Sequence, residues 1–255
     1  MTAKACDLAA IQTINNEFFI LHFNWENDAP RAGQFFMMKP LQSAVLLQRP
    51  ISVFEYNKEQ KILKFLIAKR GKGTIELSQL RPGDKVFLTG PLGNAWTDFL
   101  PEDGKAALVG GSVGIAPLAA LVAEKPDYDF HFYAGFREGF WNKDEENAFL
   151  GQAVNAKKVV IAAEDGIKAL TGRITDFLDQ SENYGVVFGC GPTQMLYVLQ
   201  KKRETKKGAC FISLESRFAC GVGACLGCSI KTVNGNRCCC KHGPIFPAGD
   251  VFFDE

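Results

Sequence analysis

Seven of the nine cysteines lie within the last 46 residues, and three of them follow a fixed spacing. Cys220, Cys225 and Cys228 form the pattern C-x4-C-x2-C, and the triplet 238–240 begins ten residues later. This is the spacing of plant-type [2Fe–2S] sites, which take a fourth cysteine from farther along the chain. The glycines between these cysteines let the backbone pass close to a cluster. We therefore expect residues 207–255 to form a small cluster-binding domain.

A structural zinc site is the alternative for these cysteines. Zinc motifs usually open with C-x2–4-C pairs set two knuckles apart. Here three cysteines crowd into nine residues and the fourth ligand stands alone, which favours [2Fe–2S]; reactive thiols are a third alternative. The spacing leaves open which of Cys238, Cys239 and Cys240 is the fourth ligand. We expect Cys6 and Cys210 to be ordinary small apolar residues.

The charge balance and the N-terminus exclude several classes of partner. Lys and Arg number 29 against 28 for Asp and Glu, without a basic block, which argues against nucleic acid or an anionic membrane surface. The first residues lack the pattern of a secretory signal, and no apolar run approaches the roughly 18 residues of a membrane span. We therefore expect a cytoplasmic protein, in which clustered cysteines bind metal rather than form disulfides.

Residues 1–101 have the pattern of a β-rich domain. Short apolar or alternating runs are separated by turn signals such as Pro30, Gly33 and Pro82-Gly83. Several short strands at this spacing predict a small antiparallel barrel. A single helix-like insert covers 74–80. The expected strands are 18–25, 33–39, 49–56, 61–69 and 84–90.

Residues 102–206 change to strand–helix alternation, which predicts a parallel sheet with helices on its faces. The overall fold class is thus multi-domain, β followed by α/β. The expected strands are 105–111, 129–135, 158–165 and 184–191. The expected helices are 113–124, 142–152, 174–180 and 192–203.

Two glycine turns of this second domain are candidate nucleotide sites. Gly110-Gly111-Ser112-Val113-Gly114 joins a strand to a helix, and although it is not G-x-G-x-x-G it offers backbone donors to a pyrophosphate. Gly189-Cys190-Gly191-Pro192 ends a later strand at the carboxyl edge, where open α/β folds bind ligands, so Cys190 can face a nicotinamide ring. The alternatives are a tight turn without ligand and a buried small residue at a helix cap.

Two segments of the first domain are candidate flavin contacts. Arg49-Pro50-Ile51-Ser52 lies in an expected strand, where a guanidinium suits a pyrophosphate and Ser52 can hydrogen-bond a flavin ring. Gly71-Lys72-Gly73-Thr74 precedes a helix start, where free N–H groups attract an anion. The alternative is an arginine that merely caps a strand.

The order of barrel, nucleotide fold and plant-type cluster resembles the ferredoxin–NADP reductase superfamily with an iron–sulfur extension. More narrowly, the chain resembles the electron-transfer subunits of B-type dihydroorotate dehydrogenase over nearly its whole length. The most specific segments are LESRFACGVGACLGC (214–228) and CKHGPIFPAGDVFF (240–253). Supporting segments are 33–35, 49–52, 81–93, 110–118 and 189–195.

This resemblance implies three cofactors and their contacts. FAD is expected at Arg49, Pro50, Ile51, Ser52, Gly73 and Thr74, with Leu66, Ile67 and Ala68 lining the flavin. NAD, the hydride partner, is expected at Gly110, Gly111, Ser112, Gly114, Cys190, Gly191 and Pro192. The family's last cluster cysteine stands shortly before Gly-Pro, which selects Cys240, so the implied cluster ligands are Cys220, Cys225, Cys228 and Cys240.

The resemblance also implies a partner. In the family, electrons pass from dihydroorotate through FMN, cluster and FAD to NAD, in pyrimidine biosynthesis. The expected partner is an FMN-containing catalytic subunit, in a heterotetramer of two copies of each chain, and no general acid or base is expected on this chain. One alternative is a related diaphorase subunit of an NADH–ferredoxin:NADP reductase or a sulfhydrogenase. Another is a non-enzymatic zinc or cluster-binding module.

Overall fold

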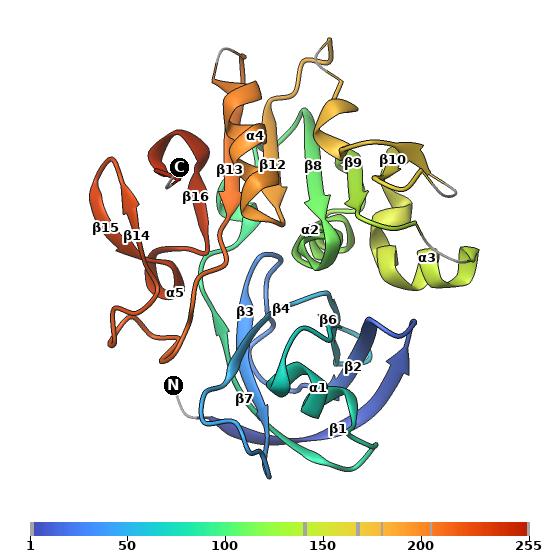
Figure 1. Cartoon of the computed structure of the whole chain (residues 1–255), viewed down its shortest axis with the longest axis vertical. Coiled ribbons are helices and arrows are strands. Elements are labelled where there is room, and N and C mark those ends of the chain that lie inside the picture. Colours follow the sequence, from blue (N-terminus) through green and yellow to red (C-terminus); the bar gives the residue numbers. More distant parts are fainter. Residues whose placement is uncertain (1–2, 140–141, 167–168, 180, 205, 254–255) are drawn as a thin grey trace.

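The computed structural model describes residues 3–139, 142–166, 169–179, 181–204 and 206–253. Figure 1 shows three parts: a β-sheet domain in blue and teal, an α/β domain from green to orange, and a small red region beside both. The predicted order of a β domain followed by an α/β domain is confirmed. None of the described helices is long and apolar enough to span a bilayer.

The first domain is a curled seven-stranded antiparallel sheet in the order β4-β3-β7-β1-β2-β6-β5. Large side chains such as Phe19, Phe36 and Phe65 fill its interior. Its helix, α1 (Lys72–Ser78), begins two residues before the predicted segment. The strands are β1 (Lys4–Thr13), β2 (Phe18–Asn24), β3 (Phe35–Pro40), β4 (Arg49–Ser52), β5 (Glu55–Asn57), β6 (Ile62–Ala68) and β7 (Lys85–Leu92).

The second domain is a seven-stranded sheet in the order β11-β10-β9-β8-β12-β13-β16, parallel except for β16 at its edge. Strand β8 is buried on both faces, since Ala106 and Leu108 join one core while Ala107 and Val109 join the other. The strands are β8 (Lys105–Gly111), β9 (Asp129–Phe136), β10 (Lys158–Ala163), β11 (Leu170–Thr171), β12 (Val186–Cys190), β13 (Ala209–Ser213) and β16 (Ile245–Pro247).

Three helices cover this sheet: α2 (Ile115–Glu124), α3 (Lys143–Leu150) and α4 (Thr193–Arg203). Helix α2 buries Leu118 and Leu121 in the same core as Leu66 of the barrel, so the two domains share apolar packing. The helix predicted over 174–180, whose last residue lies outside the described residues, is only a 3-10 turn, Ile174–Asp176.

The red region contains the hairpin β14 (Ser229–Thr232) and β15 (Gly235–Cys238) and the one-turn helix α5 (Cys239–His242). Strands β13 and β16 fall in the sequence range predicted for the cluster domain, but they complete the sheet of the second domain. The cluster region is therefore anchored to the α/β sheet at both of its ends.

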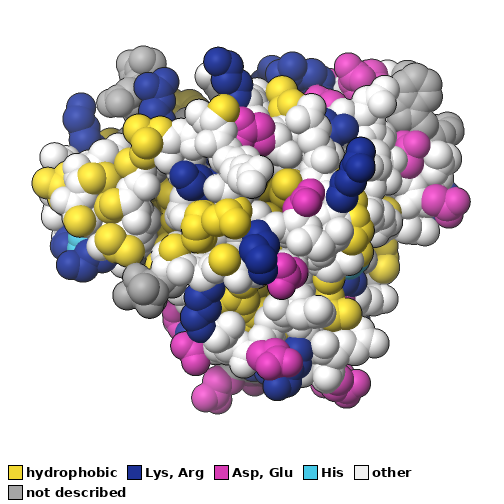
Figure 2. All heavy atoms as spheres, turned by 90° about the horizontal axis from the view of Figure 1, so that it is seen from below, with side chains coloured by type: hydrophobic (Ala, Val, Ile, Leu, Met, Phe, Trp, Pro, Cys, Tyr) yellow, Lys and Arg dark blue, Asp and Glu magenta, His cyan; other side chains and the backbone are white. Residues whose placement is uncertain are grey.

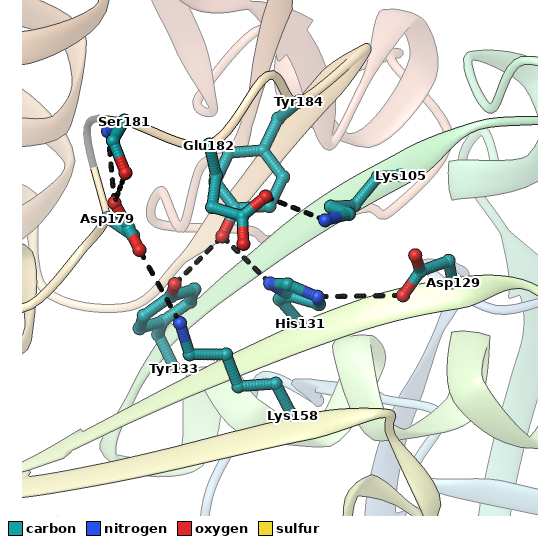
Figure 3. A network of polar contacts seen from close by, with 9 residues as sticks. All are labelled: Lys105, Asp129, His131, Tyr133, Lys158, Asp179, Ser181, Glu182 and Tyr184. Carbon is teal, nitrogen blue, oxygen red and sulfur yellow. Dashed lines mark hydrogen bonds and ion pairs between the residues drawn. The ribbon is translucent and has the colours of Figure 1, made fainter.

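A polar network crosses the amino-terminal side of the parallel sheet, opposite the glycine turns. Figure 3 shows the hydroxyl of Tyr184 between Tyr133 and His131, at 2.8 Å from Tyr133 Oη and 3.0 Å from His131 Nδ1. Two ion pairs surround it, Lys105–Glu182 and Lys158–Asp179, and His131 Nε2 lies 3.6 Å from Asp129 Oδ1. The network secures the loop before β12 and lies away from the candidate site.

Candidate cofactor crevice and cluster site

The two glycine turns predicted for NAD lie side by side at the carboxyl edge of the parallel sheet. Strands β8 and β12 pair in parallel, with Cys190 opposite Gly110. A Cβ on Gly114 would lie 2.4 Å from the Cys190 carbonyl oxygen, and one on Gly191, where φ is +152°, would lie 2.9 Å from the Gly111 nitrogen. Only glycine permits this approach. The tertiary structure thus joins the two candidate turns into a single edge.

Cys190 itself is buried, and its surroundings keep the thiol protonated. Burial raises the pKa of Cys190, the charge of Glu215 raises it further, and a hydrogen bond with Ser213 opposes both. Glu215 follows β13 and is solvent-accessible, yet desolvation raises the pKa of its carboxyl, with Arg70 acting in the opposite direction. Neither Glu215 nor Arg70 was among the predicted site residues. The Glu-Ser-Arg that precedes the first cluster cysteine was the available signal.

Arg49 lies against the first turn of α1. A Cβ on Gly73 would lie 2.6 Å from the Arg49 Nε, so only glycine leaves room for the guanidinium there. The Thr74 hydroxyl accepts hydrogen bonds from the N–H groups of Arg70 and Gly71, which orders the turn before the helix. The two predicted flavin segments, 49–52 and 71–74, are therefore adjacent, and the Arg49 guanidinium lies beside the N-terminus of α1.

The predicted flavin residues of β4 and β6 differ in their surroundings. Ile67 is buried in the barrel core and offers only its backbone to a cofactor. Leu66 and Ala68 instead belong to the core between the two domains. Ile51 is half-buried against the barrel core and, because side chains alternate along a strand, shares a face of β4 with Arg49, while Pro50 and Ser52 lie on the other face.

The cluster loop surrounds its cysteine sulfur atoms with backbone donors. The Cys225 N–H donates to Cys220 Sγ at 3.4 Å, and the Gly223 N–H donates to Cys240 Sγ at 3.1 Å. The N–H groups of Cys225, Val222 and Ala224 lower the pKa of Cys220 to about 6. A thiolate stabilised by backbone N–H groups is suited to bind iron. The donor set therefore fits the predicted cluster.

The four predicted ligands lie in two pairs. Cys228 Sγ donates to Cys240 Sγ at 3.3 Å, and the Cys225 side chain hydrogen-bonds Cys220. Across the described residues, no three ligand-type side chains converge on one point as the ligands of a single metal ion do. Two pairs of cysteines match a two-iron cluster, in which each iron takes two protein ligands, better than tetrahedral zinc.

The cluster loop packs directly on the barrel. The Phe218 ring lies 5.1 Å from the Phe35 ring, and Phe35 is the β-ladder partner of Ser52 in the predicted flavin strand. A recess of about 410 Å³, lined in part by Gln34, Gly93 and Cys240, separates the barrel turn from the loop. The predicted flavin and cluster sites are therefore neighbours.

Solved structures share this architecture and define its class. The fold is similar to that of an NADH-dependent reduced ferredoxin-NADP oxidoreductase, with a TM-score of 0.81 and 22% identity over 98% of this chain and 91% of that chain. It is also similar to a ferredoxin NADP+ reductase from Neisseria gonorrhoeae, with a TM-score of 0.63 and 13% identity over 79% of this chain and 90% of that one. The fold is that of the ferredoxin–NADP reductase class.

Sequence comparisons narrow the class to a family. Residues 215–252 match the model of the iron-sulfur cluster binding domain of dihydroorotate dehydrogenase B. The electron transfer subunit of dihydroorotate dehydrogenase B (NAD(+)) from Clostridium acetobutylicum is 36% identical over 88% of this chain and 87% of its own length. That from Caldanaerobacter subterraneus subsp. tengcongensis is 35% identical over 94% of each. The chain belongs to this family of electron transfer subunits.

Proposed function

We propose that this chain passes electrons between a catalytic partner subunit that oxidises dihydroorotate and NAD, through a [2Fe–2S] cluster and FAD. The proposal rests on the packing of the cysteine loop, whose cysteines lie in two pairs, against β3, the strand next to the predicted flavin strand β4. Phe218 stands two residues before the first cysteine and contacts Phe35, the neighbour of Ser52. This packing supports a one-electron site beside the expected flavin site.

The barrel residues bind and orient FAD, which when bound supplies the exchange between paired and single electrons. Arg49 and the N–H groups that begin α1 hold the diphosphate, since a guanidinium and free backbone donors both suit phosphate oxygens. Pro50 and Ser52 lie against the ring, with Leu66 and Ala68 from β6. Ile67 holds β6 in place from the barrel interior, and Ile51 lies on the same face of β4 as Arg49.

The carboxyl edge of the parallel sheet binds NAD. Gly110, Gly111, Ser112 and Gly114 present backbone N–H groups to the pyrophosphate, and Gly191 and Pro192 close the other side. Burial beside Glu215 raises the pKa of Cys190, so this thiol lines the nicotinamide site without acting as a nucleophile.

The four cysteines hold the cluster in two pairs. Cys220 and Cys225 bind one iron, and Cys228 and Cys240 bind the other, as their pairing through hydrogen bonds suggests. The backbone N–H groups of Gly223 and Cys225 remain as donors to sulfur and tune the reduction potential. The partner carries FMN, and the assembly contains two copies of each chain.

The test is an anaerobic co-purification from the native host, assayed for dihydroorotate-dependent reduction of NAD. The expected result is activity that co-purifies with a second, FMN-bearing chain. A coloured protein that NADH bleaches but dihydroorotate leaves unchanged would show that the relay is right and the partner wrong. A colourless protein containing zinc would overturn the proposal.

The Cys225→Ser variant separates the two halves of this function. Because Cys225 is a ligand at the exposed side of the cluster, its loss should abolish electron passage to the partner. NADH reduction of FAD should remain within about twofold of the native rate, since that step uses only the proposed FAD and NAD sites. Stopped-flow absorbance under anaerobic conditions measures both. Equal loss of both steps in a folded variant would count against the relay.

A further inference from the structure

Asn94 lies just after β7, where the barrel, the cluster region and the edge strand β16 meet. Its side-chain amide pairs with both backbone groups of a single residue: Nδ2 donates to the Ile245 carbonyl at 2.9 Å, and Oδ1 accepts from the Ile245 N–H at 3.1 Å. The Asn94 backbone N–H also donates to the Gly243 carbonyl at 2.8 Å. Asn94 thus supplies this segment with hydrogen bonds that a neighbouring strand would otherwise provide.

The segment that Asn94 holds, 243–245, directly follows the helix turn that carries Cys240. The Gly243 N–H donates to the Cys239 carbonyl at 3.0 Å, and the Leu214 N–H donates to the Pro244 carbonyl at 2.9 Å. A Cβ on Gly93 would lie 2.6 Å from Pro244 Cδ, so the end of β7 also packs closely on this segment. The position of α5 is therefore fixed from the barrel by polar and apolar contacts.

The same strand leads back to the flavin motif. In the barrel ladder, Leu92 at the end of β7 pairs with Phe35, and Phe35 pairs with Ser52. Neighbouring strands β4, β3 and β7 thus connect Ser52 to Asn94 and the segment after Cys240, with an irregularity of the β3–β7 ladder between Phe35 and Met37. No other Asn or Gln side chain in the described residues is recorded with hydrogen bonds to both backbone groups of one residue in that segment.

We infer that Asn94 is a positioning residue that sets the spacing between the flavin face of the barrel and the cluster ligand Cys240. It contacts neither the reacting atoms nor the ligand sulfur atoms, and it acts through the segment 243–245. The inference rests on the proposed function, because the spacing matters only if electrons pass between these two sites. Because the rate of electron transfer falls as two redox sites move apart, loss of the Asn94 hydrogen bonds should slow reduction of the cluster measurably.

The experiment uses the full-length holoprotein and the variant Asn94→Ala, with Asn15→Ala as matched control. Asn15 also accepts two backbone hydrogen bonds, from Glu17 and Phe18, but within a barrel turn remote from the cluster segment. Anaerobic stopped-flow mixing with NADH resolves flavin bleaching from the later reduction of the cluster. Hydrogen exchange of the peptide containing Ile245 shows, independently of activity, whether the Asn94–Ile245 hydrogen bonds are intact.

In Asn94→Ala we expect flavin bleaching at the native rate and cluster reduction slowed severalfold. The Ile245 peptide should exchange faster, while the cluster's visible spectrum stays unchanged. Asn15→Ala should alter neither phase. An unchanged rate of cluster reduction, with protection of Ile245 lost, would overturn the inference.

Asn94→Asp keeps the test decisive if the alanine variant fails to retain a cofactor. A carboxylate still accepts from the Ile245 N–H but cannot donate to its carbonyl. We expect cluster reduction between the rates of the native and alanine proteins, and a native rate in this variant overturns the inference. If NADH does not reduce the cluster in the native protein, the proposed function is wrong. That result is distinct from the one that would overturn the positioning role of Asn94.

Discussion

The surroundings differ among the three consecutive cysteines at and after the end of β15, Cys238, Cys239 and Cys240. Cys240 Sγ lies 3.3 Å from Cys228 Sγ and accepts the Gly223 N–H. Cys238 Sγ instead lies 3.7 Å from the Ser229 hydroxyl. Cys239 is fully buried. Burial raises the pKa of Cys239 and of Cys240 alike to about 12, so the pKa does not separate these two. The side-chain directions thus support Cys240 as the fourth ligand, an assignment that stays a prediction.

Two substitutions test that assignment. Cys240→Ser should remove the cluster, because one iron loses a ligand, while Cys238→Ser should retain it. Iron content and the visible circular dichroism of the anaerobically purified proteins measure the outcome. Retention of two irons per chain in Cys240→Ser together with their loss in Cys238→Ser would assign the site to Cys238.

Gly114 offers a second test at the scale of a residue. In Gly114→Ala the new methyl group meets the Cys190 carbonyl at 2.4 Å, so the two turns must separate. We expect a loss of about 1–3 kcal/mol in the free energy of unfolding, typical of overpacking, and weaker binding of NADH with FAD retained. Urea unfolding and NADH titration measure the two effects. Gly185→Ala, whose methyl group would have its nearest neighbour at 3.8 Å, is the control and should change neither.

At the scale of elements, the parallel sheet carries the two glycine turns predicted to bind nucleotide at one edge and a polar network at the other. Tyr133 and Tyr184 are buried, and burial is the main cause that raises the pKa of Tyr184. Burial lowers the pKa of His131, and Lys105 lowers it further. His131 therefore remains neutral in the fold, accepting or donating one hydrogen bond to Tyr184 according to its tautomer.

This gives a pH dependence with a definite sign. The unfolded chain takes up a proton on His131 near pH 6.5, whereas the folded chain resists it, so stability falls as pH decreases below about 6.5. His22, whose pKa burial also lowers, acts in the same direction. In His131→Gln we expect a smaller drop in the urea midpoint between pH 7 and pH 5 than in the native protein. An equal drop in both proteins would show that His131 contributes nothing.

The sequence pattern located the elements of the parallel sheet but not its edge. Strands β8, β10 and β12 lie within the predicted segments, and β9 ends one residue beyond its segment, because each contains a mainly apolar run. Strand β16 is only three residues long and pairs with β13 across more than thirty intervening residues, so no local periodicity indicates it. The segment at 174–180 has a helical pattern yet forms only a 3-10 turn, packed through Ile174 against β9.

At the scale of the whole molecule, the cluster loop is the part that reaches outward. Cys225 is exposed, and beside it Val222 and Leu226 are 49% and 63% accessible. Figure 2, seen from below, shows apolar side chains grouped on the same side of the molecule as the cluster region, with Lys and Arg around them. Exposed apolar groups rimmed by charge are typical of a contact with another protein.

We expect this loop to contact the catalytic partner subunit, because electrons must leave through an exposed edge of the cluster. Leu226→Asp should weaken the complex about tenfold or more, on the scale of ~1.4 kcal/mol. Leu226 has a φ of +58°, a conformation that Asp tolerates better than Leu, so the variant should fold. Calorimetric titration with the partner measures the change. Val233→Asp, also exposed but at the far turn of the hairpin, is the control; equal weakening by both variants would place the contact elsewhere.

The sequence by itself predicted the [2Fe–2S] cluster, the two domain classes and the turns expected to bind nucleotide. Each of these depends on spacing or periodicity within about twenty residues, and local patterns record such information directly. The tertiary structure decided which side chains of β6 face the second domain: Leu66 and Ala68 lie in the core shared by the two domains, whereas Ile67 lies in the barrel core. It also brought Glu215 to Cys190 and Asn94 to Ile245, in the latter case across 151 positions. Such contacts follow from how three parts pack together, and no segment of the chain encodes them alone.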